Sequence, residues 1–179
     1  LHYRVLVDVV QRSLKTHLLD VPRSCPFLVA PTAFHGLASN QAECATVVGA
    51  HAAGSIFIAS TLSNRSIEDI VGASVGPVWF QLYIYKDRSV TRELIRRAER
   101  AGCEALVLTV DAAEIGTRYR DEDNAFQLPP HLRIGNLVGT TKESLGRNTD
   151  SSSLSAYVRH QLDASLTWAD LSWLVEQTQ

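Results

Sequence analysis

The chain has 179 residues, of which 45% are hydrophobic and 20% charged, and its formal net charge is -2 at pH 7. This composition is that of a globular protein with a core of ordinary size. No apolar run approaches the roughly 18 residues of a membrane span, and no N-terminal stretch has the pattern of a secretory signal. No Lys/Arg block favours binding to nucleic acid or anionic lipid. We therefore expect neither nucleic acid nor a membrane among the partners.

The three cysteines, Cys25, Cys44 and Cys103, are scattered along the chain. None belongs to a CxxC pair or has a histidine at ligand spacing, so we expect no metal site. Isolated thiols in an odd number are typical of a reducing compartment. We expect a cytoplasmic protein, or a peroxisomal one if the source is eukaryotic. Because the chain lacks methionine and begins at Leu1, we also expect it to be a piece of a longer polypeptide.

The first expected elements are a strand over Pro26–Ala30, a helix, and a second strand over Ser55–Ala59. Both strands are apolar nearly throughout rather than alternating, which is typical of strands covered on both faces of a parallel sheet. The helix between them is expected to begin at Asn40 as N-cap, with Glu43 as capping partner, and to end at Gly54.

The same alternation continues along the chain. A short helix after Ser66 leads to a strand over Val78–Leu82. A longer helix, from about Ser89 to Ala101 with Gly102 as its stop, leads to a strand over Ala105–Val110. Strand starts recur every roughly 23 to 29 residues, the spacing of a repeated βα unit. The fold class is therefore α/β.

The alternation of strands and helices stops after the fourth strand. Residues 112–166 show no convincing periodicity, and structureless stretches of this length are usually lids or disordered segments. Thr167, with Asp170 three residues later, then starts another helix. Two architectures remain open. One is a complete doubly wound sheet, and the other is half of a (βα)8 barrel, since a whole barrel needs about 250 residues. The absence of the phosphate-binding glycine motifs of open sheets tilts the choice to the barrel.

Hydrogen-bonding side chains follow each of the four expected strands. In both architectures the C-terminal ends of parallel strands meet at one edge, where ligands bind. Ser, Thr and Asp also end strands simply because they favour turns, but Gln81 and Tyr83 are not turn formers. The strand-end segments are Pro31–Ala33, Ser60–Thr61, Gln81–Tyr83 and Thr109–Asp111.

These segments carry a family resemblance. The sequences APTA (30–33), FQLYIYKDR (80–88) and LTVD (108–111) closely resemble the FMN-dependent α-hydroxy acid oxidase and dehydrogenase family, which includes glycolate oxidase, lactate oxidase and mandelate dehydrogenase. The resemblance implies a (βα)8 TIM barrel of the FMN-linked type. Residues 1–179 would be a single partial domain with about the first four βα units, and 112–166 would be a lid-like loop. Weaker matches lie at 4–9, 124–129 and 161–168.

The resemblance also implies FMN as the cofactor, lying across the mouth of the barrel. Polar groups suit its ring, because each buried rim atom left unpaired would cost about 1–3 kcal/mol. The implied cofactor-binding residues are Pro31, Thr32 and Ala33 in the first loop, and Ser60, Gln81 and Thr109 through their side chains.

Three further residues are implied to act on substrate. Tyr83 would meet the substrate at the flavin face, Asp111 would orient and stabilise a catalytic histidine, and Arg118 would meet a carboxylate through paired donors. The parent enzyme would oxidise an L-2-hydroxy acid to the 2-oxo acid. By resemblance, the histidine and the FMN phosphate site belong to a C-terminal half outside this chain, so we expect the chain alone to be inactive.

Two other interpretations remain. The chain as it stands would be a non-catalytic half barrel that self-associates or pairs with a C-terminal half, because open strand edges and an uncovered interior favour association. The parent enzyme itself is expected to be a homo-oligomer. The last interpretation is another flavin- or phosphate-binding barrel.

Overall fold

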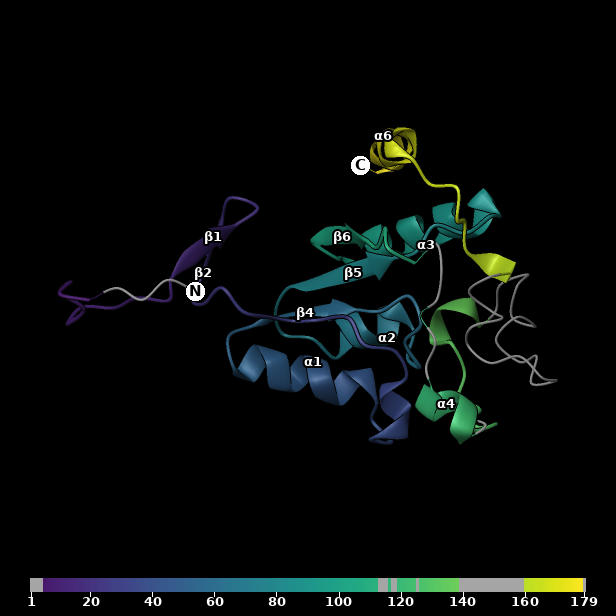
Figure 1. Cartoon of the computed structure of the whole chain (residues 1–179), viewed down its shortest axis with the longest axis horizontal. Helices are drawn as coiled ribbons and strands as arrows, with labels where there is room; N and C mark the ends of the chain where they lie inside the picture. The colour runs from purple at the N-terminus through teal and green to yellow at the C-terminus, as the bar shows by residue number, and fades with distance from the viewer. Residues whose placement is uncertain (1–4, 113–115, 117–118, 125, 139–159, 179) are drawn as a thin grey trace.

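The computed structural model describes residues 5–112, 116, 119–124, 126–138 and 160–178. Its centre is a parallel sheet whose strands follow one another in chain order, β3-β4-β5-β6 (Figure 1). A doubly wound sheet would reverse its strand order at a switch point, so the order among the described strands favours a barrel wall. The strands are β3 Leu28–Val29, β4 Ile56–Ala59, β5 Val78–Leu82 and β6 Ala105–Leu108.

All four predicted strands are confirmed, but the outer two are shorter than expected. Only Leu28 and Val29 of the first pair with β4, since Pro26 has no N–H to donate and Phe27 is exposed. The fourth strand ends before Val110, whose side chain is also exposed. The two inner strands, which pair on both sides, match the predicted positions most closely.

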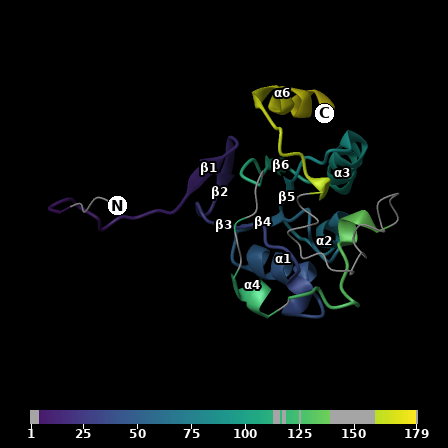
Figure 2. The same ribbon diagram turned by 45° about the vertical axis from the view of Figure 1, so that its right-hand side comes forward.

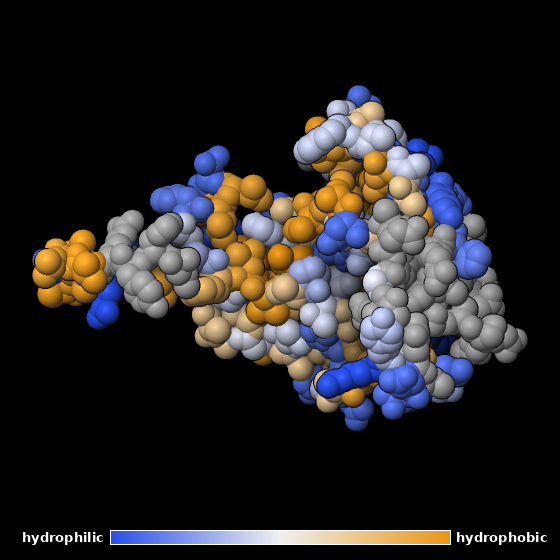
Figure 3. Space-filling model, in the orientation of Figure 1, coloured by the Kyte–Doolittle hydropathy of each residue, from blue (hydrophilic) through white to orange (hydrophobic). Residues whose placement is uncertain are grey.

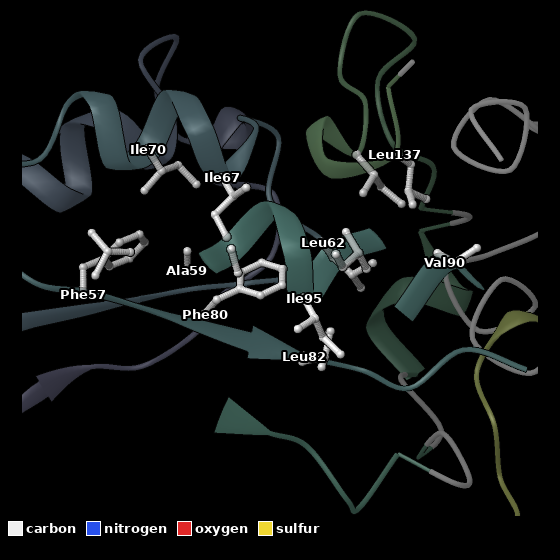
Figure 4. Packing of buried hydrophobic residues seen from close by; sticks show 14 of the residues in the cluster. Phe57, Ala59, Leu62, Ile67, Ile70, Phe80, Leu82, Val90, Ile95 and Leu137 are labelled. Carbon is white, nitrogen blue, oxygen red and sulfur yellow. The ribbon is translucent and has the colours of Figure 1, made fainter. Parts of the chain in front are cut away.

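The helices that alternate with the strands are α1 Glu43–Ala52, α2 Ile67–Gly72 and α3 Arg88–Ala101. Their apolar side chains join those of alternate strand residues in one cluster. Figure 4 shows Ile67 and Ile70 of α2 facing Phe57 and Phe80 of the sheet. Each side chain of this size contributes about 1.5–3 kcal/mol when fully buried. The cluster therefore holds the helices against one face of the sheet.

The predicted start of α2 and the predicted stops of α1 and α3 are confirmed, with Gly54 at φ 70° directly after the C-cap of α1, but the predicted start of α1 is wrong. Ser66 caps α2 through its side chain, and Gly102 ends α3 with φ 94°. The N-cap of α1 is Ala42 and not Asn40, and it makes no side-chain capping bond. The carboxylate of Glu43, expected to complete that cap, is turned instead toward two other loops.

A last helix, α6 Trp168–Gln177, carries the predicted capping box between Thr167 and Asp170. It lies beside α3 in both ribbon views (Figures 1 and 2). Arg88, at the start of α3, bonds Asp170 over 2.6 Å and lies 5.1 Å from the centroid of the Trp173 ring. These contacts fix α6 to the outer helical layer.

An antiparallel hairpin that the sequence analysis did not anticipate precedes the sheet. It consists of β1 Thr16–Leu18 and β2 Val21–Arg23. Leu19 and Asp20 form the turn, both with positive φ. Arg23 bonds Glu104 over 2.6 Å, next to the first residue of β6. The hairpin is thus tied to the N-terminal end of the sheet.

Within residues 112–166, part of the described chain is firmly packed. The segment contains α4 Tyr119–Asp123 and the 3-10 turn η2 Gly135–Leu137. Residues 134–137 are all buried, although the sequence around them has no hydrophobic periodicity that would predict this. The assignment of 1–179 as one partial domain with a lid-like loop stays a prediction. Among the described helices, none has both the length and the hydropathy needed to cross a bilayer.

Candidate active site

The C-terminal ends of β4, β5 and β6 bring three of the expected cofactor residues together. Gln81, which is 2% exposed, lies between the other two. Its Nε2 donates to Oγ1 of Thr109 over 2.8 Å, and its Oε1 accepts from Oγ of Ser60 over 3.4 Å. The three side chains therefore form one hydrogen-bonded row across three neighbouring strands.

The orientation of the Gln81 amide is fixed by a backbone donor. The N–H of Thr61 can only donate, and it lies 3.0 Å from Oε1 of Gln81. The amide oxygen must therefore be on that side and the NH2 group on the side of Thr109. The Thr109 oxygen accepts, so its own hydrogen is left to be donated to a ligand. The row thus presents a hydroxyl donor at the edge of the sheet.

Tyr83 and Asp111 lie at the same edge: Tyr83 directly follows β5, and Asp111 comes three residues after the end of β6. Tyr83 is half-buried and Asp111 is exposed. A pocket opens there, bounded on one side by the strand ends and on the other by the segment that leads into α6. Its lining is Tyr83, Ile84, Thr109, Val110, Ala112, Leu162, Asp163, Ala164 and Leu166. Tyr83 and Thr109 therefore line this pocket, whereas Asp111 does not, although its neighbours Val110 and Ala112 do.

The predicted residues after β3 are less enclosed. Pro31 and Thr32 are exposed, and the Thr32 hydroxyl makes a long 3.5 Å bond to the carbonyl of Ala30. Ala33 is half-buried and packs against the hydrophobic core. Arg118, the third predicted catalytic residue, lies outside the described residues, and its role stays a prediction.

Sequence reasoning missed the main function of Glu43, which ties two of these loops together. The side chain is fully buried. Its Oε1 accepts from the backbone N–H groups of His35 (3.2 Å) and Asn64 (3.0 Å), and its Oε2 from that of Arg65 (3.0 Å). A buried carboxylate needs such donors to replace its lost hydration. Glu43 therefore joins the loop after β3 to the loop after β4.

Comparison with known proteins decides which family this site belongs to. Residues 1–179 match a family model described as FMN-dependent dehydrogenase. The chain belongs to the FMN-dependent dehydrogenase family. This assignment confirms the resemblance and decides against a different flavin- or phosphate-binding barrel.

Relatives within the family include two oxidases. The L-lactate oxidase of Nostoc sp. is 46% identical over 175 residues, which cover 96% of this chain and 48% of that protein. The glycolate oxidase of Spinacia oleracea is 42% identical over 171 residues, covering 96% of this chain and 46% of that protein. The chain thus spans about half the length of the curated relatives it matches.

Solved structures of family members confirm the fold. Mandelate oxidase with (S)-4-hydroxymandelic acid superposes with a TM-score of 0.84 at 32% identity, over 98% of this chain and 49% of that chain. A soluble mutant of the membrane-associated (S)-mandelate dehydrogenase from Pseudomonas putida gives a TM-score of 0.82 at 35% identity, over the same shares. The chain supplies about the first four βα units of an FMN-linked TIM barrel.

FMN is the cofactor of this family, and the donor set at the strand ends fits it. An isoalloxazine ring is an apolar plate with polar edge atoms, and buried edge atoms need partners. The row of Ser60, Gln81 and Thr109 offers hydroxyl and amide groups along one line, next to the pocket at Tyr83. Within the described residues, no group of three or more His, Cys, Asp or Glu side chains is placed to hold a metal ion.

Proposed function

We propose that the protein to which this chain belongs oxidises an L-2-hydroxy acid to the 2-oxo acid with FMN. The hydrogen-bonded row of Ser60, Gln81 and Thr109 is the observation that carries this proposal. The activities for which two relatives are named, L-lactate oxidase and glycolate oxidase, support the substrate class. When bound, FMN supplies the acceptor for the two electrons removed from the substrate.

The residues of this chain would bind and orient. Gln81 and Thr109 would hold the polar rim of the flavin, and the backbone of Pro31–Ala33 would contact its edge. Tyr83 would donate a hydrogen bond to the substrate at the flavin face, and Asp111 would support the histidine that takes the α-proton. Because that histidine is expected in the C-terminal half of the protein, the isolated chain is proposed to be inactive.

A hybrid enzyme tests the proposal. Residues 1–179 are joined to the C-terminal half of the Nostoc L-lactate oxidase, and flavin absorbance is followed without oxygen as lactate, glycolate or mandelate is added. We expect at least one acid to bleach the flavin. Asp111→Asn should slow bleaching about 10²–10⁴-fold, whereas Asp123→Asn, an exposed control in α4, should not. A folded, flavin-loaded hybrid that no hydroxy acid bleaches would refute the proposal.

A second proposal concerns the chain by itself: a non-catalytic half barrel that self-associates or pairs with a C-terminal half. Among the described strands, β3 and β6 each pair along one edge only. Figure 3 shows hydrophobic residues gathered in the hollow between the β1–β2 hairpin and α6. Light scattering with intact-mass analysis should find assemblies larger than 19.7 kDa. A compact monomer would contradict self-association.

We further propose that the protein acts in the cytoplasm, or in peroxisomes if the source is eukaryotic. Cys25, Cys44 and Cys103 are all free thiols, as expected in a reducing compartment. Fluorescence microscopy of the tagged parent protein in its own host tests this location. Signal at the cell surface or in the medium would contradict it.

A further inference from the structure

A fully buried asparagine, Asn136, contacts the backbone next to the hydrogen-bonded row of Ser60, Gln81 and Thr109. Nδ2 of Asn136 donates to the carbonyl oxygens of Ser60 (3.2 Å) and Thr61 (3.1 Å). Oδ1 of Asn136 accepts from the backbone N–H of Ile67 over 2.9 Å. The side chain is 0% exposed, so its amide is committed to these three backbone groups. Asn136 therefore fixes the turn that follows β4 from beneath.

One peptide unit connects Asn136 to this hydrogen-bonded row. The carbonyl of Ser60 and the N–H of Thr61 belong to the same planar trans peptide, so they point in opposite directions. Asn136 holds the oxygen end together with Ser63, whose hydroxyl (2.7 Å) and N–H (3.1 Å) also donate to the Ser60 carbonyl. Oε1 of Gln81 accepts from the N–H end over 3.0 Å. Rotation of this peptide would break the bonds at both ends. Asn136, the one of these donors that comes from a distant segment, therefore helps to set the position of the N–H that orients Gln81.

The resulting chain of hydrogen bonds has a single direction. It begins at the backbone N–H of Ile67, which can only donate, and passes through Asn136, the Ser60–Thr61 peptide and Gln81 to Thr109. Every amide is oriented by a backbone group, so none can flip without leaving a buried partner unpaired. Successive dipoles aligned in this way reinforce one another.

The backbone of Asn136 is itself held in place. Nη1 of Arg97 donates to the carbonyl of Asn136 over 2.6 Å, and the N–H of Gly135 donates to the carbonyl of Ser63 over 2.8 Å. A Cβ on Gly135 would lie only 2.5 Å from the carbonyl carbon of Arg65. The segment therefore approaches the turn after β4 as closely as its backbone allows.

We propose that Asn136 is a positioning residue for flavin binding: it fixes the Ser60–Thr61 peptide, and thereby the Gln81 amide and the Thr109 hydroxyl, in the donor arrangement that the flavin edge needs. The inference rests on the proposed function, since it takes the flavin as the ligand of Gln81 and Thr109. Asn136 does not touch the flavin; it acts through the peptide.

Asn64 offers a matched control. Its Nδ2 donates to the carbonyl of Arg133 and its Oδ1 accepts from the N–H of Gly36, both over 2.8 Å. It therefore ties the same segment to a neighbouring loop with a side-chain amide, but it makes no bond to the Ser60–Thr61 peptide. A purely structural role predicts similar losses from Asn136→Ala and Asn64→Ala.

The test is a double-mutant cycle on FMN affinity in the hybrid described above, with FMN itself as the probe. Thr109→Val and Asn136→Ala should each raise the Kd for FMN about tenfold. Because both act through one chain of bonds, the double variant should bind hardly more weakly than Thr109→Val alone. Asn64→Ala should change the Kd less than twofold and should add independently to Thr109→Val.

A second measurement uses the 179-residue chain without flavin. By NMR, Asn136→Ala should speed exchange of the Thr61 amide hydrogen at least tenfold and shift the Gln81 side-chain NH2 signals, whereas Asn64→Ala should leave both unchanged. Unchanged Thr61 and Gln81 signals in Asn136→Ala would overturn the inference, as would additive losses in the cycle. If Thr109→Val leaves FMN affinity unaltered, the proposed cofactor residues fail, which is a separate result.

Discussion

The loops after β3 and β4, which would both contact the flavin, are built in opposite ways. Thr61 and Ser63 in the loop after β4 are fully buried, and Thr61 is bonded to both Gln81 and Asn136. In the loop after β3, Pro31 and Thr32 are exposed. The packing of this chain alone therefore organises one side of the mouth. The other side is expected to take its final form against a ligand.

The largest effect is expected at the link between these loops. Glu43→Ala removes the fully buried acceptor of three part-buried backbone N–H groups, each of which costs about 1–3 kcal/mol when it is left unpaired away from water. Urea unfolding should show a loss of about 3–5 kcal/mol in the free energy of unfolding. Glu93→Ala, in a surface pair with Arg100, should change it by less than about 0.5 kcal/mol. A loss below about 1 kcal/mol for Glu43→Ala would show that the loops are not joined through this carboxylate.

Two glycine substitutions test how closely residues 134–137 pack against the loop after β4. Gly135→Ala places a Cβ 2.5 Å from the carbonyl carbon of Arg65, and backbone cannot move aside as a flexible side chain can. We expect destabilisation by about 2–3 kcal/mol. Gly49→Ala, in α1 with no atom within 4 Å of the added Cβ, should instead stabilise by about 0.5–1 kcal/mol. Equal melting shifts for both variants would contradict the close packing of residues 134–137.

A smaller effect should appear on acidification. Arg97, which also holds Asn136, donates two hydrogen bonds to Glu68 and so lowers the pKa of that carboxyl below its usual value of 4.5. A lowered folded-state pKa stabilises the fold above 4.5, and this stabilisation is lost as pH falls through the folded value. Because the Glu68 side chain is 48% exposed, we expect only about 1 kcal/mol.

Unfolding of wild type and Glu68→Gln at several pH values measures this effect. The stability difference should be full at pH 7 and shrink steadily below pH 4.5. If the difference stayed constant to pH 3, the loss would come from packing and not from the charge of Glu68.

The smallest effect is expected in the open loop. Thr32→Ala removes an exposed hydroxyl whose hydrogen bond is 3.5 Å long. We therefore expect the free energy of unfolding to change by no more than about 0.5 kcal/mol, with a correspondingly small shift of the melting temperature. Differential scanning calorimetry measures it. A loss comparable with that of Gly135→Ala would mean that both loops are equally fixed by packing.

The features that follow from local chemistry were predicted well. The strands were predicted because they are apolar on both faces. Ser66, Gly102 and the Thr167–Asp170 capping box were predicted because helix ends depend on residues close to them in the sequence. The convergence of Ser60, Gln81 and Thr109 followed from parallel strand ends meeting at one edge.

The features that depend on distant partners were missed. Asn136 lies in a stretch without periodicity, and its partners are about seventy positions earlier in the chain. Glu43 fitted a capping pattern, but tertiary donors compete for its carboxylate. The β1–β2 hairpin turns at Leu19–Asp20 without the Asn-Gly or Asp-Gly pair that marks such turns. For Asn136 and Glu43 the deciding contacts lie far away in the sequence, whereas the hairpin pairs nearby residues such as Leu18 and Val21 and lacks only the usual turn signal.

The β1–β2 hairpin has a practical consequence. Arg23 holds it to Glu104 at the strand starts, and in Figure 1 it projects away from the ends of the strand arrows. Its tip at Leu19 and Asp20 is exposed. A cysteine or click handle introduced there would let the protein be attached to an electrode or bead with the C-terminal ends of the strands directed into solution.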